Sequence, residues 1–120
     1  MPDYDYLITS GKLIDGMGTP WRYADVAVSG GTIAAIGKNL DLTGAHQVID
    51  AAGKFVCPGF IDTHSHVDIT VLADERMEYR LLQGITTEVV GQDGLSYAPV
   101  SPVHLHKWRK YLTGLNGDYG

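Results

Sequence analysis

The sequence has few of the features that mark secreted, membrane-spanning or nucleic-acid-binding proteins. Its 120 residues include one cysteine, Cys57, so no disulfide can form within the chain. No apolar run approaches the roughly 20 residues that span a bilayer, and no run of Lys or Arg favours nucleic acid. The N-terminal stretch MPDYDYLITS is acidic and lacks the basic and apolar segments of a signal peptide. We therefore expect a cytoplasmic protein with no nucleic-acid or membrane partner.

The composition indicates a folded globular chain. Hydrophobic residues make up 44% of the sequence and charged residues 19%, a balance that argues against disorder. The formal net charge of −5 favours solubility and further weakens a nucleic-acid function.

Residues 1–57 have the pattern of a small β domain. Aromatic and β-branched residues predict a strand over 4–9, and alternating valines around a Ser-Gly-Gly turn predict a hairpin over 24–37. Two short strands are expected within 46–59, on either side of Ala52-Gly53. Short strands with glycine turns are typical of a small sandwich or barrel.

Residues 58–120 change to an α/β pattern. We expect a strand over 59–64, a helix over 72–83, a strand over 85–91 and a helix over 101–114. This order is the start of a parallel α/β array. An eight-stranded barrel takes about 250 residues, so the chain is either a small unusual fold or the first part of a longer one.

The second predicted helix has recognisable ends and one apolar face. Ser101 suits the N-cap and Pro102 the first helical position. Leu105, Trp108 and Leu112 follow at helical spacing, which predicts a single buried stripe.

The end of the strand at 59–64 carries two histidines one residue apart, His64 and His66. On a continuing strand these side chains point to the same face about 7 Å apart and can converge on one metal ion. Asp62 shares that face, where it can orient a ligand imidazole; the alternative is that it caps a helix or forms a salt bridge elsewhere. From spacing alone, the pair can equally well be polar residues that form hydrogen bonds at a loop mouth.

A second pair with the same spacing, His104 and His106, serves as an internal comparison. On the predicted helix these side chains lie about 200° apart around the axis, so they cannot share a metal. We expect them to be surface or partly buried helix residues.

Three stretches carry a resemblance to a known family. The stretch PGFIDTHSHVD (58–68) resembles the first-strand metal motif of the amidohydrolase superfamily. The stretch QGITTEVVGQDGLSYAP (83–99) is similar to the second-strand region of N-acyl-D-amino-acid deacylases, or D-aminoacylases. The opening, YDYLITSGKLIDGMGTPWRYADVAVSGGTIAAIG (4–37), also fits that branch, so the resemblance covers nearly the whole chain.

The resemblance implies a mixed β and α/β fold: a small β-sandwich domain (1–57) followed by the first two β/α units of an incomplete TIM-like barrel (58–120). It also implies a zinc ion with His64 and His66 as ligands. Asp93 stands where the best-known deacylases have a zinc-binding cysteine, and it can be a harder ligand or simply a turn residue.

By the same resemblance, the intact enzyme hydrolyses the amide of an N-acyl-D-amino acid. The family's catalytic aspartate and further histidines lie later in the barrel, so no catalytic residue is assigned in this chain. The remainder of the barrel is expected in a longer or separate chain. The alternatives are a hydantoinase-like or dihydroorotase-like amidohydrolase and a non-catalytic interaction module.

Overall fold

The computed structural model describes residues 4–68, 70, 74–96 and 98–116. Contacts divide the chain into two units, with the boundary between Pro58 and Gly59. Within the described ranges, every helix is too short or too polar to cross a membrane.

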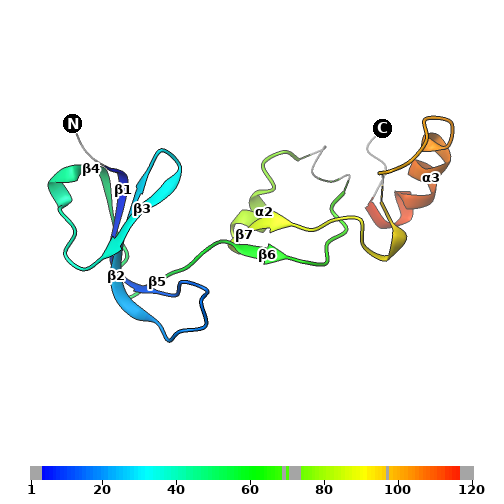
Figure 1. Ribbon diagram of the computed structural model, residues 1–120. Helices are drawn as coiled ribbons and strands as arrows, with labels where there is room; N and C mark the ends of the chain where they lie inside the picture. The colour runs from blue at the N-terminus through cyan, green and yellow to red at the C-terminus, as the bar shows by residue number, and fades with distance from the viewer. Residues whose placement is uncertain (1–3, 69, 71–73, 97, 117–120) are drawn as a thin grey trace. The chain divides into compact units, whose positions relative to one another are not determined.

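The first unit is a five-stranded mixed sheet in the order β3-β2-β1-β4, with β5 pairing along the end of β1 (Figure 1). β2 runs antiparallel to both β1 and β3, whereas β4 and β5 run parallel to β1. The predicted hairpin and the two short strands after it are confirmed. In chain order the elements are β1 (Tyr4–Leu13), β2 (Arg22–Ser29), β3 (Thr32–Gly37), the 3-10 helix η1 (Leu42–Gly44), β4 (Ala45–Asp50) and β5 (Phe55–Val56).

β1 is longer than the strand predicted over 4–9. Ser10 and Gly11 form a bulge inside one continuous strand, where the pairing with β2 shifts between Ile8 and Gly11. Ser10 adopts a left-handed conformation there, with φ of 62°, which re-aims the strand without ending it. A Cβ at Gly11 would lie 2.5 Å from Val56 Cγ2, so glycine is what lets β5 approach β1.

The β2–β3 hairpin turns through two glycines. Gly30 and Gly31 have φ of 58° and 76°, the pair of positive values that a two-residue type I′ turn requires. Asp5 on β1 fixes this turn, because its carboxylate accepts a hydrogen bond of 2.7 Å from the Gly30 N–H.

One face of this sheet carries a small buried cluster beside an open apolar surface. Leu13, Ala24 and Val26 are at most 7% exposed, whereas Ile33 and Ile36 are 65% and 44% exposed. An apolar depression of about 300 Å³ lies over this face. Among the described residues of this unit the strands form a single sheet, so the second layer of the predicted sandwich is not seen there.

The second unit is built on two parallel strands, β6 and β7, which lie side by side in Figure 1. The predicted order of strand, helix, strand and helix is confirmed. Both strands are shorter than the predicted 59–64 and 85–91, and each ends at an acidic residue, Asp62 or Glu88. The elements are β6 (Phe60–Asp62), α2 (Glu78–Leu81), β7 (Ile85–Glu88), the 3-10 helix η2 (Gln92–Gly94) and α3 (Leu105–Asn116).

The helix predicted over 72–83 is wrong in its extent. Residues 72 and 73 lie outside the described residues, and the remainder is helical only over α2. Met77 adopts a left-handed conformation, with φ of 47° and ψ of 38°, which cannot continue a helix. The Asp74 carboxylate accepts hydrogen bonds from the N–H groups of Arg76 and Met77, and these bonds favour a turn over a helix.

The last helix also begins later than predicted. Ser101 does not act as the N-cap, because residues 102–104 form a turn and α3 begins at Leu105. The predicted apolar stripe is confirmed in part: Leu112 is 1% exposed and Leu105 is 39% exposed. The indole N–H of Trp108 donates a hydrogen bond to the Ser96 carbonyl, which ties α3 to the loop after η2.

Candidate metal centre

The two histidines at 64 and 66 lie just beyond the carboxyl end of β6. The strand ends at Asp62, whose carboxylate accepts a hydrogen bond of 3.1 Å from the His64 N–H. Between the histidines, the Ser65 N–H donates to the Val89 carbonyl at 3.2 Å, and Ser65 is 2% exposed. The segment that carries both imidazoles is therefore fixed by backbone hydrogen bonds, although it is not a strand.

Asp93 follows β7 in a tight turn. Within η2 it has φ of 56° and ψ of 22°, and Gly91 and Gly94 on either side also have positive φ. Aspartate is one of the few residues that tolerate the left-handed region. The two interpretations of Asp93 are therefore compatible: it is a turn residue, and the turn directs its carboxylate at the histidines.

The three side chains meet at one point. Asp93 Oδ2 lies 3.0 Å from His64 Nε2 and 3.3 Å from His66 Nε2. All three possible ligand atoms lie within 4.8 Å of one another. The imidazole centroids are 5.4 Å apart with the rings inclined at 75°. We refer to His64, His66 and Asp93 as the metal centre.

The donor set of the metal centre fits a zinc ion. Two imidazole nitrogens and one carboxylate oxygen are ligands that zinc takes in proteins, and three protein ligands leave a position open. The side chains of His64 and Asp93 are each 59% exposed and that of His66 is 28% exposed. His66 Nδ1 is buried and has no hydrogen-bond partner among the described residues.

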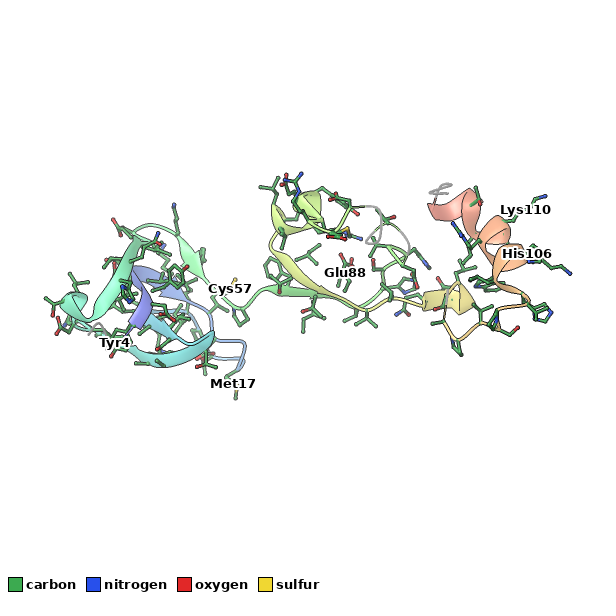
Figure 2. All side chains as sticks on the ribbon, turned by 90° about the horizontal axis from the view of Figure 1, so that it is seen from above. Tyr4, Met17, Cys57, Glu88, His106 and Lys110 are labelled. Atoms are coloured by element: carbon green, nitrogen blue, oxygen red, sulfur yellow. The ribbon has the colours of Figure 1, made fainter. Side chains whose placement is uncertain are left out.

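The comparison pair on the last helix behaves differently. His104 lies in the turn before α3 and forms a hydrogen bond of 2.8 Å through Nδ1 with the Ser101 hydroxyl. His106 lies on α3 and points away from it (Figure 2). Both are exposed and neither belongs to the metal-ligand grouping found in the described part of the chain. The prediction that both are surface residues is confirmed, although only His106 is helical.

Two further acidic residues do not contact the imidazoles. Asp62 takes the salt-bridging role: it pairs with Arg80 at 3.3 Å, and it also accepts the His64 N–H. Asp68 is half-buried, and its Oδ2 has no hydrogen-bond partner among the described residues.

A cluster around Arg80 adjoins the metal centre and was not predicted from the sequence. Its guanidinium reaches Asp62, Ser65 and Glu88. One sequence feature could have indicated this cluster: two acidic residues end neighbouring parallel strands. The ends of parallel strands meet at one edge of a sheet, so these two carboxylates lie close together. Nothing in the helical pattern of 72–83 marks Arg80 as their partner.

Known proteins resemble this chain in sequence and in fold. The Amidohydrolase family model matches residues 47–117. A D-aminoacylase of Alcaligenes xylosoxydans xylosoxydans is 46% identical over 98 residues, which are 82% of this chain and 20% of that protein. A solved structure of N-acyl-D-glutamate deacylase from Bordetella bronchiseptica, complexed with zinc and a phosphonate inhibitor, is 47% identical with a TM-score of 0.76, and the match covers 82% of this chain and 20% of that one.

A solved structure of D-aminoacylase, described with a binuclear metal centre, has a TM-score of 0.76 and 38% identity, covering 91% of this chain and 27% of that one. The chain therefore belongs to the amidohydrolase family. Within that family its similarity lies with the D-aminoacylase branch, as the sequence motifs predict. The chain spans about a fifth of the length of the D-aminoacylase from Alcaligenes.

Proposed function

We propose that this chain supplies the first part of the zinc site of a hydrolase that cleaves the amide bond of N-acyl-D-amino acids. The products are a carboxylate and a D-amino acid. The observation that carries the proposal is the convergence of His64, His66 and Asp93, whose ligand atoms lie within 4.8 Å of one another in a chain of the D-aminoacylase branch.

Each residue of the metal centre has a separate part in this function. His64 and His66 hold the ion through Nε2, and Asp93 adds one carboxylate oxygen. Zinc, when bound, lowers the pKa of a water molecule and polarises a carbonyl group. The carboxylate of Asp93 is a harder donor than a cysteine thiolate. A site with this carboxylate therefore has a smaller preference for zinc over harder divalent ions than a site with a thiolate.

The fold proposed for the whole protein follows from two uncovered surfaces. The apolar face of the first sheet, with Ile33 and Ile36 exposed, fits a second sheet that completes a sandwich. The parallel pair β6 and β7 fits the first two strands of a TIM-like barrel, since parallel sheets are normally covered on both faces. The remaining strands, and the general base, would come from a longer or separate chain.

Zinc titration of the 120-residue chain tests metal binding directly. We expect calorimetry to detect one zinc site in the unsubstituted chain. In H64Q/H66Q the zinc affinity should fall by more than the roughly 10- to 100-fold that is typical when an outer partner of a metal ligand is lost. H104Q/H106Q is the matched control, because it removes the same spacing of histidines from an exposed position. Equal weakening in both double variants would contradict the proposal.

A chimera tests the reaction. The 98 residues matched to the Alcaligenes D-aminoacylase would replace the corresponding segment of that enzyme. We expect zinc-dependent release of a D-amino acid, abolished by H66Q and retained in H104Q/H106Q. A folded chimera that binds zinc but releases no D-amino acid would refute the assigned reaction while leaving the metal site intact.

A further inference from the structure

We propose that Arg80 is a positioning residue of the metal centre, which it acts on through Asp62 and Ser65. The inference rests on the proposed zinc site. Arg80 lies on α2 and contacts none of the three ligand side chains in the described structure. Its influence therefore has to pass through the residues that hold the segment carrying His64 and His66.

The guanidinium spans the carboxyl ends of both strands. Nη1 lies 3.3 Å from Asp62 Oδ2, and Nη2 donates a hydrogen bond of 3.2 Å to Ser65 Oγ. Nε lies 2.9 Å from Glu88 Oε1, an ion pair without hydrogen-bond geometry. Asp62 and Glu88 are the last residues of β6 and β7, and Glu88 is labelled in Figure 2. One side chain thus joins the two strand ends from which the metal centre projects.

Two of these contacts continue to the histidines. The other oxygen of Asp62 accepts the His64 N–H, so the carboxylate is held between the guanidinium and the backbone of a proposed ligand. Ser65 lies between the two histidines, and Arg80 holds its hydroxyl while Val89 holds its N–H. Rotation of the segment that carries His64 and His66 would break at least one hydrogen bond in the path through Asp62 and one in the path through Ser65.

The charges in the cluster explain why an arginine is needed. Asp62 and Glu88 are direct neighbours in the parallel register of β6 and β7, a like-charge pair that is unfavourable by itself. Their side chains are 26% and 18% exposed and that of Arg80 is 22% exposed, so water screens the carboxylates poorly. The planar guanidinium offers several donors in fixed directions, whereas a lysine offers a point charge.

The central variant is R80K, which keeps the positive charge and loses the planar set of hydrogen-bond donors. We expect R80K to fold and to bind zinc about 10- to 100-fold more weakly, the range typical of an outer partner of a metal ligand. The matched control is R76K, since Arg76 pairs only with exposed Glu78 at 3.0 Å among the ion pairs of the described residues. A spectroscopic readout accompanies affinity: the visible absorption of bound Co²⁺ should change in R80K and not in R76K.

A second measurement needs no metal. Amide hydrogen exchange of His64 and Ser65 should be faster in R80K than in the unsubstituted chain, and unchanged in R76K. The double variant R80M/E88Q removes the charge of Arg80 together with one of its carboxylates. It should also bind zinc weakly while circular dichroism shows a folded chain.

The outcomes separate the two claims. Equal zinc affinity in R80K, R76K and the unsubstituted chain would overturn the inference alone. The inference would also be overturned if R80K bound zinc as tightly as the unsubstituted chain once the affinity is corrected for the folded fraction. Arg80 would then only stabilise the fold. If the unsubstituted chain bound no zinc, the proposed function would fail and this inference with it.

Discussion

The imidazole Nε2 of His64 lies 3.0 Å from Oδ2 of Asp93, although 29 residues separate them in the sequence. The contact exists because both residues follow parallel strands whose carboxyl ends meet at one edge. In α/β folds, active and binding sites lie at the carboxyl ends of the parallel strands. The position of Asp93 relative to His64 and His66 therefore connects the fold to the proposed chemistry.

Replacing Asp93 with asparagine should weaken zinc binding by about tenfold or more, which corresponds to about 1.4 kcal/mol. Asparagine has the same shape and tolerates the left-handed conformation of this turn, so D93N removes the charge and preserves the backbone. Calorimetry measures the change. D41N is the control, because Asp41 caps η1 in the first unit. Unchanged affinity in D93N would assign Asp93 to the turn alone.

Replacing Gly59 with alanine should destabilise the second unit. A Cβ at Gly59 would lie 2.7 Å from Thr86 Cβ across the β6–β7 pair, so the two strands would have to separate. The expected loss is about 1–3 kcal/mol in denaturant unfolding, as for other overpacked sites.

Two further variants test the cause of that loss. G59A/T86G removes the clashing side chain and should be less destabilised than the sum of its single substitutions. In G114A the new Cβ meets no atom of the described residues within 4 Å, so stability should be unchanged or higher by up to about 1 kcal/mol. Strict additivity in the double variant would show that Thr86 is not the cause.

The meeting of the two histidines was predictable from their spacing, but the reason differs from the expected one. The pattern predicts a strand that continues to His64, whereas β6 ends at Asp62. The Asp62 carboxylate accepts the His64 N–H, and that hydrogen bond replaces strand pairing at this point. Local competition of a side chain for the backbone is difficult to read from hydrophobic periodicity.

The elements were predictable in type and order, and less so in length. Alternating valines and paired glycines identify the β2–β3 hairpin because each feature acts locally. The helix over 72–83 failed because Met77 is left-handed, which no propensity favours for methionine. Arg80 was missed because its role depends on two strand ends that only the folded chain brings together.

Replacing Arg22 with glutamine should raise the pKa of Asp15. The hydrogen bond from the Arg22 guanidinium, at 2.6 Å, is the main cause that holds the pKa of Asp15 below its ordinary value of 3.8, and the Met17 N–H adds to it. A lowered folded-state pKa stabilises the folded chain above that ordinary value, and this stabilisation is lost as pH falls through the lowered value. In R22Q this stabilisation should therefore be smaller, and its loss should be complete at a higher pH.

Carbon-detected NMR titration of the carboxyl groups measures this change. The pKa of Asp41, lowered mainly by the Thr43 N–H, serves as the internal control and should not move in R22Q. An unaltered pKa for Asp15 would show that the Met17 N–H, rather than Arg22, dominates.

The central claim is that His64, His66 and Asp93 together bind zinc, and X-ray absorption of the zinc-loaded chain tests it most directly. We expect nitrogen and oxygen neighbours of zinc at about 2.0–2.2 Å, with outer scattering from two imidazoles that is lost in H64Q/H66Q. A sulfur neighbour at about 2.3 Å would instead assign the ion to Cys57. That result, or imidazole scattering that survives in H64Q/H66Q, would contradict the account.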